Sequence, residues 1–178
     1  MLDRQSGRLK KLVEDLVEAS KASSGNLPVE LTPCNVGVLL TQTIGEFEEK
    51  LQKAGVTPVL KMSSENVTVL ADGRHLWRVF DNLLNNVCKY AMEGTRVYIT
   101  VAENSKGTEI IFRNISKYQL NITAEELMER FVRGDKSRNS EGHGLGLSIV
   151  RSLLELQNGR LELSVDGDLF KATVIFDK

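Results

Sequence analysis

Two asparagines and a lysine recur at helical spacing in the segment 73–92, as Asn82, Asn86 and Lys89. At about 100° per residue, the three positions fall within about 60° of one another on a helix. Tyr90 lies beside them, toward the apolar side of the segment. An amide oxygen can bind magnesium, and a lysine one turn away can neutralise a phosphate. Because asparagine is a poor helix former, the repetition favours a binding site, with a solvated, asparagine-rich helix face as the alternative.

Three glycines alternate with other residues just before an apolar helical segment, as Gly142, Gly144 and Gly146. Glycine lets backbone N–H groups approach an anion closely, and the positive end of the following helix points at the same place. The segment therefore has the character of a phosphate-binding loop, although it matches neither the P-loop nor the dinucleotide-binding pattern. A flexible turn is the alternative.

Hydrophobic periodicity predicts the elements that hold these segments in place. Apolar residues recur every three or four positions in the expected helices, and they alternate or form short runs in the expected strands. Asp72 is a natural N-cap for the helix with the asparagines, and Gly55 is expected to end the helix before it. Helices on one face of a mixed sheet fit this order best, which is an α+β, two-layer sandwich. The expected helices are 2–23, 35–54, 73–92, 124–130 and 144–157, and the expected strands are 56–62, 67–71, 96–102, 108–113, 160–165 and 169–176.

Composition limits the class of protein. Of the 178 residues, 41% are hydrophobic and 26% are charged, which is enough for a packed core. The net charge of −1 gives no global positive field for nucleic acid. Cys34 and Cys88 form no CxxC pair, so a structural zinc site has little support and both are expected to be reduced thiols. There is no signal peptide and no apolar run of the roughly 18 residues that a membrane helix needs, so this polypeptide is expected to be soluble, without direct membrane contact.

The helix expected over 2–23 has a narrow apolar stripe that includes Leu9, Val13 and Leu16. Such a stripe is typical of a helix that pairs with other helices. A helix lying on its own domain and a self-association helix are the alternatives. The segment 23–28 contains serine, glycine and proline, and it is expected to be a linker.

Three separated segments together resemble the ATP-binding catalytic domain of sensor histidine kinases. Residues 82–90, NLLNNVCKY, are similar to the N box of that family. Residues 131–135, FVRGD, are similar to its F box and the start of its ATP lid, and residues 142–147, GHGLGL, to its second glycine box. Order and spacing agree over about 32–176. The resemblance implies the Bergerat (GHKL) ATP-binding fold and binding of ATP or ADP with Mg²⁺.

The resemblance also implies roles for single residues. Asn86 would be the main magnesium ligand, with Asn82 as a supporting polar group. Lys89 would contact the phosphates, and Tyr90 would lie against the nucleoside. The three glycines would let the lid close, and lid cations would reach the γ-phosphate unless they are simply solvated charges. The lid residues so implied are Phe131, Arg133, Lys136, Arg138, Gly142, Gly144, Leu145, Gly146 and Leu147.

One segment departs from the family pattern. The first glycine box, DxGxG, falls on Asn114, Ser116 and Tyr118, so the aspartate and both glycines are absent. In the family that aspartate accepts a hydrogen bond from the adenine amine. Asn114 can also accept one, but without charge, so adenine binding is expected to be weaker. The departure leaves open a degenerate module that binds nucleotide or docks on a partner without kinase activity. Another GHKL ATPase is a further alternative, although the leading helix and short lid argue against the topoisomerase and mismatch-repair types.

Neither histidine fits the family's phosphoacceptor motif. His75 is expected in the first turn of a helix, and His143 beside the lid glycines. The helix at the start of the chain resembles the second helix of the dimerisation and phosphotransfer domain. The expected organisation is therefore 1–24 for that helix, 25–32 for a linker and 33–178 for the catalytic domain.

As the resemblance implies, the chain would be the cytoplasmic part of a membrane-anchored, ATP-dependent protein histidine kinase. It would pass the γ-phosphoryl group to a histidine outside this chain, and from there the group would reach a response regulator. The kinase would be a homodimer, and the catalytic domain would contact the dimerisation and phosphotransfer helices of its own protein.

Overall fold

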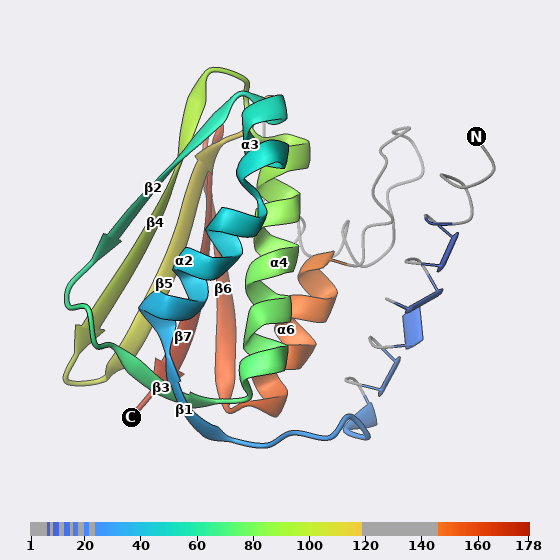
Figure 1. Cartoon of the computed structure of the whole chain (residues 1–178), viewed down its shortest axis with the longest axis vertical. Coiled ribbons are helices and arrows are strands. Elements are labelled where there is room, and N and C mark those ends of the chain that lie inside the picture. Colours follow the sequence, from blue (N-terminus) through green and yellow to red (C-terminus); the bar gives the residue numbers. More distant parts are fainter. Residues whose placement is uncertain are drawn as a thin grey trace.

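A computed structural model describes residues 24–118 and 146–178, together with residues 7, 9, 10, 13, 14, 16, 17, 20 and 21. Helices cover one face of a five-stranded sheet, so the chain forms two layers (Figure 1). The helix expected over 124–130 lies outside the described residues. The elements are β1 (Thr32–Asn35), α2 (Val36–Glu46), α3 (Glu48–Ala54), β2 (Val56–Met62), β3 (Thr68–Ala71), α4 (Gly73–Tyr90), β4 (Thr95–Asn104), β5 (Gly107–Ile115), α6 (Gly146–Leu156), β6 (Gly159–Asp166) and β7 (Leu169–Asp177).

The five-stranded sheet is mixed, with the strand order β2-β4-β5-β7-β6. β2 pairs with β4 in parallel, and the other three pairs are antiparallel. This arrangement confirms the expected α+β, two-layer sandwich. β3 is a strand as expected, but it pairs with β1 in a separate two-stranded sheet. Periodicity does not predict β1, because this short strand contains Pro33 and has no alternation of apolar residues.

The single helix expected over 35–54 is wrong, because the chain forms two helices that meet at Phe47. Phe47 has φ −95° and ψ 3°, and its side chain is buried, so the backbone turns where the ring enters the core. The Asn35 side chain caps α2 by accepting a hydrogen bond from the backbone N–H of Val38. Gly55 ends α3 in the left-handed conformation, as expected, with φ 71°.

The helix with the asparagines begins and ends for separate reasons. Asp72 caps its start as expected, because the carboxylate accepts hydrogen bonds from two backbone N–H groups of the first turn. The helix ends at Tyr90 rather than at the expected Met92. The cause is Ala91, whose backbone is extended and forms a β-bridge with Ser116. The length and rotation of α4 are therefore fixed by contacts at both of its ends.

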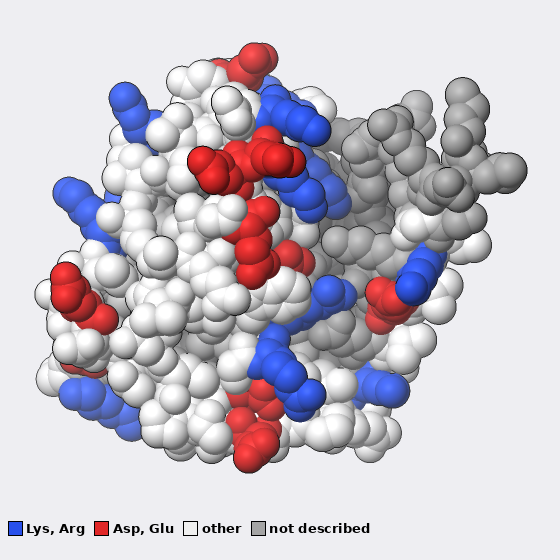
Figure 2. All heavy atoms as spheres, in the orientation of Figure 1, with Lys and Arg blue, Asp and Glu red and all other residues white. Residues whose placement is uncertain are grey.

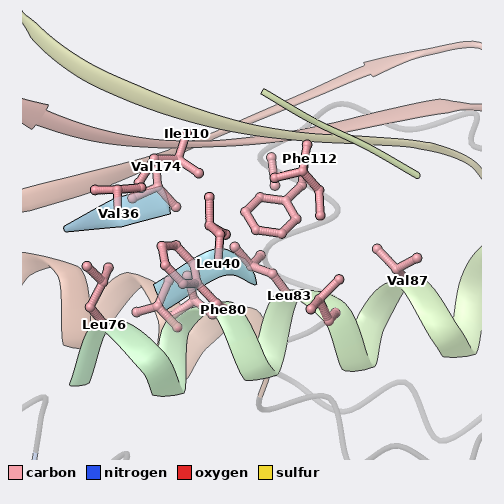
Figure 3. Close-up of a cluster of buried hydrophobic side chains, with 14 of the residues drawn as sticks. Val36, Leu40, Leu76, Phe80, Leu83, Val87, Ile110, Phe112 and Val174 are labelled. Atoms are coloured by element: carbon pink, nitrogen blue, oxygen red, sulfur yellow. The ribbon is translucent and has the colours of Figure 1, made fainter. Parts of the chain in front are cut away.

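The core lies between α4 and the inner face of the sheet (Figure 3). The rings of Phe80 on α4 and Phe112 on β5 lie 6.0 Å apart, centroid to centroid, at an interplanar angle of 38°. Leu40, Leu83 and Val174 are buried around them. Removing a buried phenylalanine from such a core costs about 3–5 kcal/mol. This packing fixes which side of α4 faces the sheet, and so fixes the edge on which the asparagines lie.

The helix expected over 2–23 is helical at every position that the structure describes between residues 7 and 24. Its described apolar side chains are not packed on the domain. Leu9 is 62% exposed, and Val13, Leu16 and Val17 are about half exposed. The stripe therefore has no partner among the described residues, which argues against a helix that lies on its own domain.

Candidate functional site

Asn82 and Asn86 lie one turn apart on the edge of α4. Asn82 is buried, and its Nδ2 donates a hydrogen bond to the Arg78 carbonyl oxygen, 2.8 Å away. This bond orients the amide and leaves its Oδ1 to face away from that carbonyl. Asn86 is half-buried, and its Nδ2 is a buried donor without a partner. Buried donors without a partner are rare in native proteins, so the position of this one requires an explanation.

The start of α6 meets both asparagines. A Cβ atom added at Gly146 would lie 3.4 Å from Asn86 Oδ1 and 3.8 Å from Asn82 Oδ1. The two amide oxygens therefore face Gly146, the first described residue of α6. Asn86 and Gly146, which are 60 positions apart in the sequence, are thus brought together here.

The last turn of α4 lies against the end of β5. Lys89 and Tyr90 occupy that turn, and both are half-buried. The Tyr90 carbonyl accepts a hydrogen bond from the backbone N–H of Lys117, 2.8 Å away, next to the bridge between Ala91 and Ser116. The segment that departs from the family's first glycine box is thus tied to the end of the helix that resembles the N box.

Asn114 lies on the inner face of β5, paired in register with Phe170 of β7. It is 4% exposed. Asn114 lies two residues before Ser116, which is bridged to Ala91 at the end of α4.

Part of the predicted site lies outside the described residues. Leu147 is described, and its side chain is fully buried in α6. The lid residues that fall outside are Phe131, Arg133, Lys136, Arg138, Gly142, Gly144 and Leu145, and His143 falls outside with them.

The far ends of the two site helices are joined by a buried polar pair that the motifs do not indicate. Gln157 follows α6, and its Oε1 accepts a hydrogen bond from the backbone N–H of Asp72, 2.9 Å away. Its Nε2 donates a hydrogen bond to the Leu153 carbonyl at 2.9 Å, so both polar atoms of the Gln157 amide are hydrogen-bonded. A polar residue that ends an apolar helix is the only sequence signal for Gln157. The pair holds α4 and α6 together at the end opposite to the asparagines.

The same aspartate anchors the segment that leads into the domain. Asp72 Oδ2 accepts a hydrogen bond from the backbone N–H of Glu30 at 2.9 Å, and the Nε2 of His75 lies 2.7 Å from the Pro28 carbonyl oxygen. Burial alone would raise the pKa of the Asp72 carboxyl, but the Glu30 N–H and the charge of His75 outweigh it, and the net pKa is lowered. His75 is in the first turn of its helix, as expected.

The donor set decides which metal this site suits. No group of three histidine, cysteine, aspartate or glutamate side chains that could hold a metal occurs within the described residues. The polar groups at the start of α6 are instead two neutral amide oxygens. Magnesium fits such a site, because it takes few protein ligands and completes its shell with water and phosphate oxygens.

Charges on the face that carries α2 and α3 are mixed in sign, with lysine and arginine interspersed among aspartate and glutamate (Figure 2). Because positive and negative side chains alternate here, this face has no broad positive potential that would attract an anion. An anion that binds here would have to be attracted by individual polar or charged groups next to it. Within the described residues, no helix is both long and apolar enough to cross a membrane.

The sequence and the fold both match known proteins. Residues 71–177 match the family described as histidine kinase-, DNA gyrase B-, and HSP90-like ATPase. The signal transduction histidine-protein kinase BaeS of Escherichia coli K12 is 32% identical over 162 residues, which cover 90% of this chain and 34% of BaeS. The probable sensor protein PcoS of Escherichia coli is 30% identical over 174 residues, which cover 96% of this chain and 37% of PcoS. The chain thus spans about a third of the length of these curated relatives.

Solved structures show the same fold. The histidine kinase AdeS of Acinetobacter baumannii superposes with a TM-score of 0.80 at 22% identity, over 99% of this chain and 81% of AdeS. The histidine kinase ThkA, in a crystal structure with the response regulator protein TrrA, superposes with a TM-score of 0.73 at 22% identity, over 97% of this chain and 48% of that chain. The family match, the named relatives and the shared fold agree with the motifs that meet at Gly146. The chain therefore belongs to the histidine kinase-, DNA gyrase B-, and HSP90-like ATPases, and the relatives that it matches are named as histidine kinases and sensor proteins.

Proposed function

We propose that this chain binds ATP, with magnesium, where α4 meets the start of α6, and that it donates the γ-phosphoryl group to a histidine. The observation that carries the proposal is the pair of amide oxygens of Asn82 and Asn86 facing Gly146, with Asn86 Nδ2 buried and unpartnered. A phosphate beside them would meet backbone N–H donors and a positive helix end, and it would satisfy the orphan amide.

Each described site residue has a proposed task. Asn86 is the main magnesium ligand, and Asn82, oriented by its bond to the Arg78 carbonyl, supports it. Lys89 neutralises phosphate charge, and Tyr90 lies against the nucleoside. Magnesium supplies charge neutralisation between the phosphate oxygens when it is bound. What remains for the chain is to position the triphosphate and to exclude water, which is most of the catalytic work in phosphoryl transfer.

The lid residues remain proposals that rest on the resemblance. Phe131 and the second glycine box would move the lid over the triphosphate, and Leu147 would anchor it from the core. The proposed γ-phosphate contacts are Arg133, Lys136 and Arg138, and the proposed hinge residues are Gly142, Gly144 and Leu145.

The phosphoacceptor is proposed to be a histidine outside this chain. His75 is a poor candidate, because its Nε2 contacts the Pro28 carbonyl and its ring lies 3.7 Å from the Asp72 carboxylate. The exposed stripe of Leu9, Val13 and Leu16 supports pairing with other helices of a dimerisation and phosphotransfer domain. We propose residues 1–24 as one helix of that domain in a homodimer, 25–32 as the linker and 33–178 as the catalytic domain.

The downstream partner is proposed from the comparisons. ThkA, which shares this fold, was crystallised with a response regulator protein. This chain would serve the same kind of relay, in the cytoplasmic part of a membrane-anchored kinase.

Calorimetric titration tests the binding proposal. ADP is titrated into the chain with and without Mg²⁺, and into the variants Asn86→Ala and Asn85→Ala. Binding that requires Mg²⁺, that weakens at least about tenfold in Asn86→Ala and that is retained in Asn85→Ala is the expected result. No heat with the unmodified chain would instead favour a module that works without nucleotide.

Labelled ATP tests the transfer proposal. Incubation of the chain with γ-labelled ATP is expected to leave no acid-labile phosphate on it, since neither of its histidines is the proposed acceptor. Acid-labile label on this chain alone would contradict an acceptor outside it.

A further inference from the structure

We propose that a cavity between α2, the start of α4 and the segment 27–28 binds a small aromatic carboxylate. The residues of α4 that line it lie in the first two turns of the helix, before Asn82 and Asn86. The inference therefore goes beyond the proposed function and does not depend on it. It follows from a hollow whose walls combine an indole ring, leucine side chains and two guanidinium groups.

Three segments that are distant in the sequence form the cavity. α2 and α4 contact each other over the sheet (Figure 1), and the Pro28 carbonyl lies 2.7 Å from His75 Nε2 in the first turn of α4. The hollow between them has a volume of about 660 Å³ and opens to solvent. Binding sites for small molecules have volumes of roughly 300–1,000 Å³. A ligand of one ring and a short acidic chain therefore fits inside.

The walls suit an aromatic ring. Trp77 on α4, Leu39 on α2 and Leu27 before the domain all line the cavity, and all three are half-buried. Trp77 Nε1 donates a hydrogen bond to Glu46 Oε2 on α2, 3.2 Å away, so the indole is oriented before any ligand enters. An aromatic ring gains from contact with the indole and from burial against the leucines. Because the indole is already oriented, little of that gain is lost in ordering it.

The charges suit an acidic group. Arg74 and Arg78 both line the cavity, and Glu46 is the one carboxylate among the lining residues. The Glu46 carboxylate already accepts the Trp77 hydrogen bond. Arg74 is 82% exposed, and its Nε lies 4.0 Å from Asp72 Oδ1, which is long for an ion pair. A guanidinium binds a carboxylate through two parallel hydrogen bonds, so an acid is favoured over a neutral ligand of the same shape.

The segment that leads into the domain forms one wall of the cavity. Asp72 Oδ2 accepts a hydrogen bond from the backbone N–H of Glu30, and His75 contacts the Pro28 carbonyl. These contacts hold Leu27 next to the start of α4. A ligand that touches both Leu27 and Trp77 would add to them. Occupation of the cavity would therefore restrain the connection between the leading helix and the domain.

Fluorescence measures occupation directly, because Trp77 is the only tryptophan in the chain. The probe is 3-phenylpropanoate, and its comparisons are the neutral 3-phenylpropan-1-ol and acetate, which has the charge without the ring. The acid is expected to change the Trp77 emission saturably, with a dissociation constant in the millimolar range or below. The alcohol and acetate are each expected to bind at least about fivefold more weakly.

Matched variants test the two parts of the site. Arg74→Glu reverses an exposed charge at the cavity and is expected to weaken the acid at least about fivefold. Arg96→Glu is the same substitution on an exposed residue of β4 that does not line the cavity, and it is expected to leave the affinity within about twofold. Leu27→Ala is expected to weaken the acid at least about threefold by removing apolar contact. Circular dichroism checks the fold of each variant, and the Arg74 and Arg96 pair carries the test if Leu27→Ala is misfolded.

Several results would overturn the inference. They are an emission that does not respond to the acid, an alcohol that binds as tightly as the acid, and an Arg74→Glu variant that binds like Arg96→Glu. The titration is repeated with saturating Mg²⁺ and ADP, and the affinity for the acid is expected to stay within about twofold. Competition by ADP would place the acid in the nucleotide site and would also overturn the inference. A chain that binds the acid but no ADP would contradict the proposed function alone.

Discussion

Replacing Asn86 by alanine is predicted to stabilise the empty protein while removing its nucleotide binding. The Nδ2 of Asn86 is buried without a partner, and a group of this kind costs about 1–3 kcal/mol of folding free energy. Alanine is also the better helix former, by up to about 0.7 kcal/mol in the interior of a helix. Against these gains stands the lost packing of a half-buried side chain. The expected net gain is about 1–2 kcal/mol, which for a chain of this size corresponds to a rise in Tm of about 2–8 °C.

Asn85→Ala is the matched control, because it is the same substitution one position away on the same helix. Asn85 has a partner, since its Nδ2 lies 3.4 Å from Asp81 Oδ2. Its change in stability is expected to stay within about 0.5 kcal/mol, as the gain in helix propensity offsets a long hydrogen bond. The free energy of unfolding is measured by urea denaturation for both variants, with and without Mg²⁺ and ADP. At about 100 times the dissociation constant, nucleotide should stabilise the unmodified protein by about 2.7 kcal/mol and Asn86→Ala hardly at all.

The order of stabilities therefore reverses when ligand is added. Without nucleotide, Asn86→Ala is the most stable of the three proteins, and with nucleotide it is the least stable. A nucleotide-free Asn86→Ala that unfolds more easily than Asn85→Ala would refute the reasoning. Such a result would mean that the Asn86 amide stabilises the fold, and that it is not an unsatisfied group whose hydrogen bond is made only with a bound ligand.

Three further substitutions test other contacts. Gly146→Ala should keep the fold, because the new Cβ makes ordinary contacts of 3.4–3.9 Å, yet it should weaken ADP binding at least about tenfold in calorimetry by filling the space before the amide oxygens of Asn86. Gly107→Ala should unfold the protein or cost more than about 3 kcal/mol in urea denaturation, because φ is +154° and the Cβ would lie 2.2 Å from the Phe176 carbonyl oxygen. Asp72→Asn should lower stability at neutral pH, and the difference from the unmodified protein should disappear in acid. The folded pKa of Asp72 lies below its ordinary value of 3.8, so its contribution is complete above that value and is lost as the pH falls through the folded pKa. Unfolding measured between about pH 2 and pH 7 checks this sign.

Hydrophobic periodicity predicted most of the fold because each helix and strand buries one face. The alternation in β4 and β5, and the three- to four-residue spacing in α4, are the direct result of that burial. Periodicity failed where another contact decided the backbone. Phe47 lies in register with its helix, so nothing in the spacing marks the turn there, and β1 is held by its pairing with β3 more than by its own pattern.

The candidate site was predictable only where its residues lie close together in the chain. Asn82 and Asn86 are one turn apart, and helical geometry alone puts them on one edge. Their meeting with Gly146 is tertiary, and it was expected only because separate motifs resembled one family. Asp72 was predicted as an N-cap, but its bond with Gln157 joins residues 85 positions apart, and no local pattern records such a contact.

The two ends of the α4 and α6 pair differ in how completely their polar groups are satisfied. At one end, Asp72 accepts hydrogen bonds on both carboxylate oxygens, and Gln157 uses both ends of its amide. At the other end, the buried Nδ2 donor of Asn86 is unpartnered. The hydrogen bonds of Asp72 and Gln157 hold α4 and α6 at a fixed spacing. Because the helices are held rigidly there, the opposite end can keep an unpaired polar group that costs folding free energy. If this division holds, substitutions at Gln157 should alter nucleotide affinity without touching the ligand, because they would release the helices whose separation sets the distance from Gly146 to the asparagines.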